Sequence, residues 1–275
     1  MSRPRASVVV PTRDRPDRLA RCLLALDAQI ELPLEVIVVD DGSVDEGAVD
    51  AAVGDRHRVR VVRAGGSGPA AARNVGAALA RGDVVCFTDD DCRPGPGWIA
   101  VLVDAVAGGA PAVAGPTRNA LPDDRWATAS QLITNHLAER SRRLGTPFAP
   151  TSNLAVRADV TRELRFDESF PLAAGEDREW CDRLAAAGHR LAWAPDAWVD
   201  HHQELSARRF LAQQARYGRG AAHLRAVGAH RAQGVGFHAG LLRRALTEGP
   251  AVAALVVLAQ MATAWGFTSE RRSQR

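Results

Sequence analysis

Three consecutive aspartates, Asp89–Asp91, follow a short apolar run in the stretch VVCFTDDDCRPGPGW (84–98). Charges of one sign this close together repel, and each raises the pKa of the next unless a positive charge lies among them. Hard carboxylate oxygens are ligands that suit Mg²⁺ or Mn²⁺. The stretch is therefore interpreted either as a divalent-cation site or as a solvated turn whose acidic residues cap the next helix.

The aspartates end one of several predicted strands. Short β-prone runs alternate with helical patterns in the first half of the chain, and we expect strands at 6–12, 34–40, 58–64, 83–89 and 110–117. Between the first two runs, apolar residues at helical spacing predict a helix with a buried stripe of Leu19, Cys22, Leu23 and Leu26. Near-continuous apolar strands separated by helices indicate an α/β fold, in which helices cover both faces of a mostly parallel sheet.

Ligands of such a sheet bind beyond the carboxyl ends of its strands, and the polar clusters of this sequence lie there. They are residues 11–14 (PTRD), 40–43 (DDGS), 65–68 (GGSG) and 89–91 (DDD). Acids, glycines and an arginine at neighbouring strand ends predict one lined crevice. The glycine-rich stretch matches neither a Walker loop nor a GxGxxG fingerprint, which argues against an ATPase or a dinucleotide-binding protein.

The second half of the chain has a looser pattern. Residues 123–143 are expected to form an arginine-rich helix, 150–157 a strand, and 175–193 a helix followed by a strand. The apolar face of that last helix is predicted to consist of Trp180, Cys181, Leu184 and Ala185. Another helix, rich in Arg and Gln, is expected from Ser206 to about Arg225.

Composition places the chain among ordinary globular proteins. It has 275 residues, of which 46% are hydrophobic and 24% charged, enough for one large domain or one domain with an appendage. Its four cysteines form no CxxC pair and have no histidine at zinc-ligand spacing, so we expect no disulfide framework and a reducing cytoplasm. The N-terminal stretch has no long apolar run, and no signal peptide is expected.

Charge is distributed unevenly along the chain. Residues 201–275 contain 11 Arg and 3 Glu, a net charge of +8, whereas the rest contains 24 Arg and 29 acidic residues, a net charge of −5. A basic tail on an acidic body predicts a polyanionic partner. Aromatic residues are sparse in the tail and no nucleic-acid motif is present, which favours an anionic membrane surface over nucleic acid.

The segment Pro250–Phe267 has no charged residue and is flanked by charged ones. Its 18 residues are at the short end for a membrane-spanning helix. We therefore expect an interfacial or membrane-docked helix, paired with residues 236–247. The alternative is a helix packed on the domain or on a partner subunit.

Six short motifs follow one another along residues 6–225: VVVPTRDR, VVDDGS, AARNVG, FTDDD, GED and a late HH. This set resembles family 2 glycosyltransferases of the GT-A fold. The resemblance implies a catalytic, Rossmann-like GT-A domain at 1–205, with a nucleotide-sugar-binding half at 1–117 and an acceptor half at 118–205. Residues 206–275 are expected to form a basic helical C-terminal extension, and their charge and the uncharged segment at 250–267 predict association with a membrane.

The activity that the resemblance implies is metal-dependent, inverting transfer of a sugar from a nucleotide-diphospho-sugar to an acceptor hydroxyl. The acceptor would be a glycan, lipid-linked or of the cell envelope, or a small molecule, and the enzyme would act at the cytoplasmic face of the cell membrane. Two alternatives stay open: a non-catalytic nucleotide-sugar-binding protein of the same fold, and a sugar nucleotidyltransferase. The latter typically has an N-terminal Gly-rich loop with Arg and Lys, and this chain has no Lys.

The family binds its nucleotide-sugar at the ends of the first strands. The resemblance assigns Pro11, Thr12 and Asp14 to this pocket, Asp41 to the base, and Arg73 to the neighbourhood of the nucleotide. From the residues alone, the DDG at 40–42 is also interpreted as an Asx-type turn with a helix cap, and the arginine as a solvated helix residue. An arginine at position 13 stands where the family often has an aromatic residue or Asn, which puts the stacking partner of the base in doubt.

The FTDDD motif corresponds to the metal site of the family, with Mn²⁺ or Mg²⁺ as the cofactor. The resemblance assigns Asp91 to direct coordination, and Asp89 to the ribose and the metal. Asp90, also at the nucleotide-sugar pocket, is expected to point the other way and to bond nearby loops. His201 is the candidate for completing the metal shell, with His202 in reserve, although single histidines are often structural.

The GED motif places Glu176 and Asp177 near a predicted helix start. The resemblance assigns Asp177 as the general base and Glu176 as an acceptor or supporting contact; without it, helix capping is the better interpretation. Asn153 and Trp180 are expected on the acceptor side, and RYGRG (216–220) is a candidate for binding phosphates of a lipid-linked acceptor. The QxxRW motif of processive synthases is not found, which predicts a single transfer.

Overall fold

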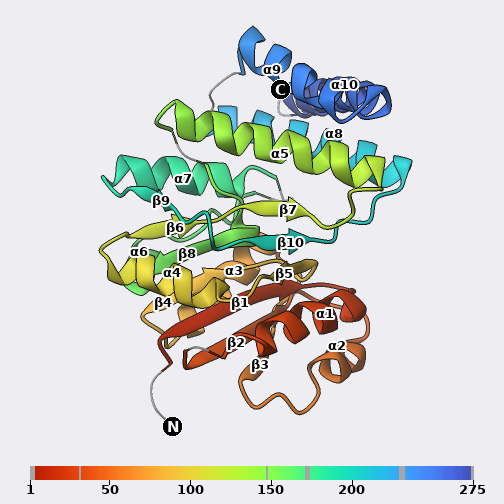
Figure 1. The fold of residues 1–275 in the computed structure, drawn as a ribbon. Coiled ribbons are helices and arrows are strands. Elements are labelled where there is room, and N and C mark those ends of the chain that lie inside the picture. The colour runs from red at the N-terminus through yellow and green to blue at the C-terminus, as the bar shows by residue number, and fades with distance from the viewer. Residues whose placement is uncertain (1–3, 31, 147, 171–173, 229–232, 274–275) are drawn as a thin grey trace.

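The centre of the protein is a seven-stranded, mostly parallel sheet (Figure 1). The structure is a computed structural model that describes residues 4–30, 32–146, 148–170, 174–228 and 233–273. From one edge to the other the strands are β3 (Val59–Arg63), β2 (Leu34–Asp40), β1 (Ala6–Thr12), β4 (Val84–Phe87), β8 (Leu154–Arg157), β6 (Ala112–Ala114) and β9 (Leu191–Trp193). Strands β3, β2, β1 and β4 are parallel, β8 lies antiparallel between β4 and β6, and β9 is parallel to β6. The predicted α/β fold is confirmed.

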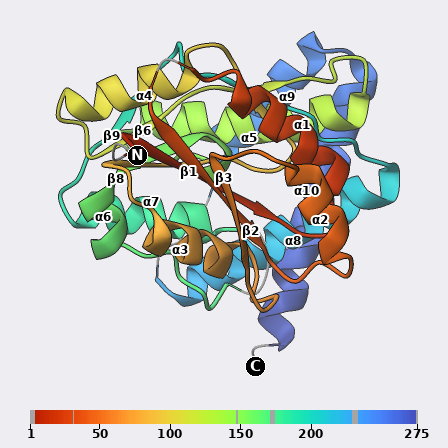
Figure 2. The ribbon, with the colours of Figure 1, turned by 90° about the horizontal axis from the view of Figure 1, so that it is seen from below.

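Alternate residues of β1 face two separate hydrophobic layers. Val8 and Val10 pack with helices α1 (Pro16–Asp27), α2 (Glu46–Val53) and α4 (Trp98–Ala107). Val9 packs with helices α3 (Pro69–Leu79), α6 (Ala158–Glu163) and α7 (Glu176–Ala186) on the other face. Figure 2 shows the two layers on opposite sides of the sheet. Because both faces are covered, the central strands are near-continuous apolar runs.

A second sheet of three short strands lies beside the first (Figure 1). Its order is β5 (Cys92–Pro94), β10 (Val199–His201), β7 (Thr117–Asn119). Strand β10 pairs antiparallel with β5 and parallel with β7, so that His201 lies opposite Cys92. This pairing brings a late histidine next to the end of the DDD motif.

Four helices of the second half form a layer of their own, at the top of Figure 1. They are α5 (Arg125–Arg143), α8 (Ala207–Ala226), α9 (Val235–Thr247) and α10 (Pro250–Ser273). Ala129, Phe210, Leu241 and Ala259, one from each helix, are fully buried in a shared hydrophobic cluster. The helices predicted at 206–225 and 250–267 are therefore present, and the inner face of α10 packs on protein.

Two predicted strands are divided in the structure. Residues 110–117 form β6 in the large sheet and the start of β7 in the small one. The chain passes between the sheets at Gly115, where a Cβ atom would lie 1.8 Å from the carbonyl oxygen of Ala197, so a side chain has no room. In the predicted strand at 150–157, Thr151–Asn153 form a short 3-10 turn before β8.

The buried face of α7 differs by one position from the prediction. Trp180, Cys181 and Leu184 are buried, but Ala185 is exposed. Glu179 is buried in its place, with its carboxylate paired to Arg183 one turn later.

Candidate active site

A pocket of about 1700 Å³ lies between the strand ends of the large sheet and the helical layer. Most of the predicted site residues line it: Pro11, Thr12, Asp14, Asp41, Arg73, Asp89, Asp90, Asp91, Glu176, Asp177 and His201. Residues far apart in the sequence meet here because the carboxyl ends of parallel strands share one edge of the sheet. The structure thus forms the crevice that the polar clusters predict.

Asp90, the middle residue of the DDD motif, joins the motif to the first strand. It is buried and accepts hydrogen bonds from Oγ1 of Thr12 (2.8 Å) and Nη1 of Arg15 (3.3 Å). Burial and the charge of Asp91 raise the pKa of Asp90 to about 6, although Arg15 opposes the rise. Asp90 thus forms hydrogen bonds with residues at and just after the end of β1, as was expected of the middle aspartate.

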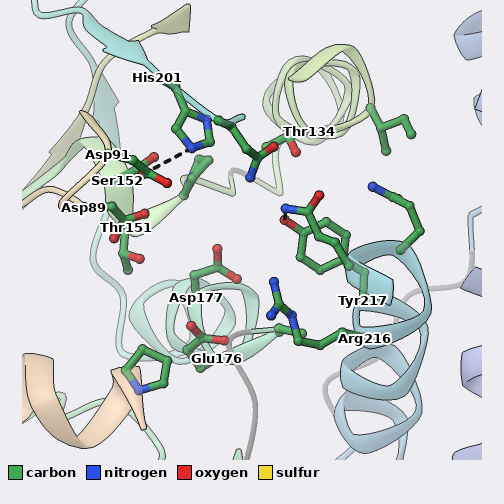
Figure 3. Close-up of a pocket in the computed structure, with 18 of the residues that line it drawn as sticks. Asp89, Asp91, Thr134, Thr151, Ser152, Glu176, Asp177, His201, Arg216 and Tyr217 are labelled. Carbon is green, nitrogen blue, oxygen red and sulfur yellow. Dashed lines mark hydrogen bonds and ion pairs between the residues drawn. The ribbon is translucent and has the colours of Figure 1, made fainter. Parts of the chain in front are cut away.

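Asp91 and His201 face each other beside the pocket (Figure 3). Nε2 of His201 lies 3.4 Å from a carboxylate oxygen of Asp91, and Nδ1 lies 2.8 Å from Oε1 of Gln131. The amide nitrogen of Gln131 donates to Asn135 and to the carbonyl of Thr117, which orients its oxygen toward the imidazole. Because an amide oxygen only accepts hydrogen bonds, we assign a proton to Nδ1 of His201.

A cation is then needed between Asp91 and Nε2 of His201, since a carboxylate and an imidazole lone pair would otherwise face each other. A proton can serve: burial alone would lower the pKa of His201, but the hydrogen bond and the charge of Asp91 raise it above its ordinary value. Burial acts to raise the pKa of Asp91, yet His201, Arg15 and Arg18 hold it below its ordinary value. A divalent cation fits the same oxygen and nitrogen donors.

Cys92 is a third group of this cluster and was not among the predicted site residues. The ligand atoms of Asp91, Cys92 and His201 lie within 4.8 Å of one another. Burial raises the pKa of the Cys92 thiol well above its ordinary value, so the thiol stays neutral. A neutral thiol is a poor ligand for Mg²⁺ or Mn²⁺, which leaves the carboxylate and the imidazole as the donors.

The two aspartates after β2 have different environments. Asp40 accepts hydrogen bonds from the backbone and hydroxyl of Ser43 and pairs with Arg63, so it forms the Asx-type turn of the alternative interpretation. Asp41 accepts from the backbone N–H of Gly68 (2.9 Å) through one oxygen. Its other oxygen is buried and has no hydrogen-bond partner in the described part of the chain. A buried carboxylate oxygen with free acceptor capacity suits the ring N–H of a nucleotide base.

Asp14 fixes the loop after β1 to the loop after β2. Its backbone N–H donates to Oγ of Ser43, and its carboxylate accepts from the backbone N–H of Val44 (2.7 Å). Its φ of 54° lies in the left-handed region, which Asp adopts more readily than most residues. Asp14 therefore shapes the pocket by holding its rim.

Arg73 connects the DDD motif to α7. The guanidinium is buried and donates to Asp89 (3.1 Å) and to Glu176 (3.1 Å). Burial alone would lower the pKa of Arg73, but Asp89 and Glu176 raise it, so the arginine stays charged. The interpretation as a solvated helix arginine is therefore wrong.

Asp177 points into the pocket from the first turn of α7, between the DDD motif and α8 (Figure 3). Its carboxylate also accepts a hydrogen bond from the backbone N–H of Arg178 (2.8 Å), so the capping role is present as well. Burial, and then the charge of Glu176, raises the pKa of Asp177 to about 7 against the opposing charge of Arg73. A carboxyl that titrates near neutral pH in an open pocket can exchange a proton with a ligand there.

Helix α8 forms the wall of the pocket opposite Asp177, with Arg216 and Tyr217 (Figure 3). Gln213 donates to the hydroxyl of Tyr217 (3.0 Å), and burial raises the pKa of this phenol to about 12, so it stays neutral. Nε of Arg216 is buried and has no hydrogen-bond partner among the described residues. Because buried donors are normally hydrogen-bonded, this N–H group can donate to an oxygen of a bound ligand. The stretch QQARY (213–217) differs from QxxRW only at its last residue, and the prediction of a single transfer did not take this near match into account.

The two residues predicted on the acceptor side do not reach the pocket. Asn153 is fully buried, where its amide nitrogen donates to two backbone carbonyls and its oxygen accepts from Nε1 of Trp98 (2.9 Å). Trp180 is buried beneath α7, and its ring nitrogen donates to the carbonyl of Leu164. Both are structural residues, and Ser152 takes the pocket-facing position beside Asn153.

Comparison with known families agrees with this geometry. The sequence model described as glycosyl transferase family 2 matches residues 7–165, and one described as glycosyl transferase family group 2 matches residues 109–268. A pre-mycofactocin glycosyltransferase of Mycobacterium tuberculosis is 32% identical over 227 residues, 79% of this chain and 47% of that protein. Glycosyltransferase AglE of Haloferax volcanii is 28% identical over 225 residues, 79% of this chain and 73% of that protein.

Solved structures show the same fold. The mannosyltransferase PcManGT from Pyrobaculum calidifontis, in complex with GDP-Man and Mn²⁺, superimposes with a TM-score of 0.63 at 22% identity, over 95% of this chain and 74% of that one. A mycobacterial protein superimposes with a TM-score of 0.61, also at 22% identity, over 84% and 77% of the two chains. The present chain spans about half the length of the pre-mycofactocin glycosyltransferase.

The inward position of Asn153 predicts the effect of its substitution. Asn153→Ala leaves Nε1 of Trp98 and the backbone carbonyls of Pro116 and Ala197 without their hydrogen-bond partner in the core. We therefore expect the free energy of unfolding to fall by about 2–4 kcal/mol. Urea unfolding followed by circular dichroism measures it. Unchanged stability together with weaker acceptor binding would restore the acceptor role.

Proposed function

The chain belongs to glycosyl transferase family 2, and on this premise we propose that it transfers a sugar from a nucleotide-diphospho-sugar to an acceptor hydroxyl. The observation that supports this most directly is the position of Asp177. Its carboxyl faces the DDD motif across the pocket and titrates near neutral pH. The donor would lie on the strand ends, and the acceptor hydroxyl would approach Asp177 from the side of the helical layer.

The donor nucleotide would bind between the first two strand ends. The free oxygen of Asp41 would accept the ring N–H of the base, in a recess bounded by Pro11 and Thr12. Arg73 would stay in its ion pairs and hold Asp89 toward the ribose. The complex of the similar mannosyltransferase with GDP-Man and Mn²⁺ supports a nucleotide-sugar donor of this kind.

Asp91 and His201 would hold the Mg²⁺ or Mn²⁺ ion, with Asp89 on the ribose side. A bound divalent cation neutralises negative charge on the diphosphate as it leaves. Gln131 keeps the proton on Nδ1 of His201 and thereby keeps Nε2 available as a donor to the ion. Arg15 and Arg18 are paired with Asp91 in this structure. Once the ion binds Asp91, these two arginines would be able to pair with the diphosphate instead.

Asp177 would take the proton of the acceptor hydroxyl. The oxygen then attacks the anomeric carbon from the side opposite the diphosphate, so the configuration inverts. Glu176 is the poorer base, because it is buried and its carboxylate forms an ion pair with the permanently charged Arg73, whereas Asp177 points into the pocket. Arg216 faces the same region from α8 and is available to an anionic group of the donor or acceptor, as in a lipid-linked glycan.

Ligand binding tests the donor and metal assignments together. We expect one of UDP, GDP or TDP to raise the melting temperature in the presence of Mn²⁺, because a ligand at 100 times its Kd stabilises the folded state by about 2.7 kcal/mol. In Asp91→Asn, Mn²⁺ should no longer increase the rise in melting temperature that the nucleotide causes. In Asp41→Asn, the nucleotide should no longer raise the melting temperature. Asp55→Asn, at an exposed aspartate away from the pocket, is the control. No shift with any nucleotide would favour a non-catalytic protein of the same fold.

The pKa of Asp177 predicts a pH dependence. A general base works only when deprotonated, so a folded-state pKa of about 7 implies that turnover falls as the pH drops below about 7, approaching tenfold per unit. Asp177→Asn should lower kcat by about 10²–10⁴-fold, with nucleotide binding retained. Release of nucleoside diphosphate between pH 5 and pH 9 is the measurement, and parental activity in Asp177→Asn would contradict the assignment.

We place the protein at the cytoplasmic face of a membrane, with α10 as the contact. In the described part of the chain, α10 is the one helix long and apolar enough to cross a membrane, and a third of its most apolar window is buried. Its outer face exposes Val257, Leu258, Met261 and Trp265. Arg271 and Arg272 follow at its end, where anionic head groups would attract them.

Flotation with vesicles tests the membrane contact. The parent should float with phosphatidylglycerol vesicles and less with neutral phosphatidylcholine, and salt should weaken the binding. The double variant Met261→Ser/Trp265→Ser should float markedly less. Leu24→Ser/Ile30→Ser, which removes comparably exposed apolar side chains elsewhere, is the matched control. Equal flotation of all three proteins would overturn the assignment.

A further inference from the structure

Helices α8 and α10 touch backbone to backbone at two glycines. A Cβ atom on Gly218 of α8 would lie 2.0 Å from the carbonyl oxygen of Thr263, and one on Gly266 of α10 would lie 2.0 Å from that of Ala215. The hydroxyl of Thr263 lies within hydrogen-bond distance of two carbonyl oxygens, that of Gln214 across the interface (3.3 Å) and that of Ala259 in its own helix (2.9 Å). The two helices are therefore in contact without intervening side chains that could adjust.

Two residues later, on another side of the helix, α8 touches the segment that leads into α7. A Cβ atom on Gly220 would lie 2.1 Å from the carbonyl oxygen of Ala174. Gly175, the residue before α7, has a φ of 99° and lies against the backbone of Gly220 and the side chain of Leu224. The start of α7, which presents Glu176 and Asp177, therefore rests on α8.

A second set of contacts joins α8 to the chain before α7. Nε2 of His223 lies 3.2 Å from Oγ of Ser169, and its ring packs edge-on against Phe170 at 4.4 Å between centroids. Arg216 and Tyr217 point into the pocket from the same helix (Figure 3). A shift of α8 would therefore move both sides of the space in which the acceptor is proposed to react.

We propose that α10 positions the reacting carboxyl of Asp177 through α8, with Gly218, Gly266 and Gly220 as the positioning residues. A Cβ atom needs at least 3.0 Å from a carbonyl oxygen, so an alanine at Gly218 or Gly266 forces the helices apart by about 1 Å. A displacement of that size can cost about 100-fold in rate even far from the chemistry. The kinetic part of the proposal rests on the proposed function; the mechanical part does not.

The test compares single substitutions in the full-length protein. Gly218→Ala and Gly266→Ala separate α8 from α10. Thr263→Val is a milder change that removes the hydrogen bonds of one hydroxyl, to Gln214 across the interface and to Ala259 within α10. Gly220→Ala displaces the start of α7 directly and is the positive control. Gly236→Ala is the matched negative control, since this helical glycine of α9 has room for a Cβ atom, 3.6 Å from Arg140.

Hydrogen exchange is the first readout, at the amide of Glu179, which bonds to the carbonyl of Gly175 (3.0 Å) at the start of α7. We expect faster exchange there in Gly218→Ala, Gly266→Ala and Gly220→Ala, a smaller change in Thr263→Val, and the parental rate in Gly236→Ala. The second readout is nucleoside diphosphate release, with kcat about 100-fold lower. The donor KM should change less than kcat, because Asp41 and Asp91, proposed to bind the base and the metal, follow β2 and β4.

Faster exchange confined to α8 and α10, with Glu179 at the parental rate, would show that the helices only stabilise each other and would overturn the proposal. A kcat at the parental value in Gly218→Ala and Gly266→Ala, in an active parent, would do the same. If the parent turns over no nucleotide-sugar, the proposed function fails while the exchange at Glu179 still decides whether α10 acts on α7.

Discussion

The buried guanidinium of Arg73 is the interaction on which the arrangement of the pocket depends. It pairs with Asp89 on one side and Glu176 on the other, and so joins residues that are 87 positions apart in the sequence. Carboxylates gathered from several strand ends repel one another unless cations separate them. Breaking a buried pair by removing one partner typically costs about 3–5 kcal/mol, so Arg73 holds the DDD motif and α7 in a fixed relation.

The same constraint explains the surroundings of the other aspartates. Arg15 and Arg18 lie on the outer side of the DDD motif, and His201 approaches Asp91 from the small sheet. Arg15 and Arg18 come from the start of α1 and His201 from β10, because no single helix or strand can surround the motif. The site is thus formed by opposite charges drawn from both halves of the chain, and it leaves the carboxyl of Asp177 free to face the open pocket.

The second half of the chain is more than a cover for the sheet. Strand β8 enters the sheet antiparallel between β4 and β6, which brings Thr151 and Ser152 to the pocket. Helix α8, expected from the sequence to belong to a C-terminal extension, forms a wall of that pocket and at the same time packs on α10. The outer face of α10 remains apolar and exposed, so a single helical layer connects the reaction centre to the proposed membrane contact.

The sequence by itself determined the first four strands and the polar clusters at their ends. These features depend on local patterns, since an apolar run is buried wherever it lies in a sheet covered on both faces.

The tertiary structure alone decided which side chains reach the pocket. Asn153 points inward because Trp98 and two backbone carbonyls meet it there, and Ser152 takes the place beside it. Cys92 lies next to His201 because β5 and β10 pair across 109 residues of chain. Arg216 faces Asp177 because glycines let α8 approach its neighbours closely. Such contacts depend on pairing and packing between distant segments, which no local pattern records.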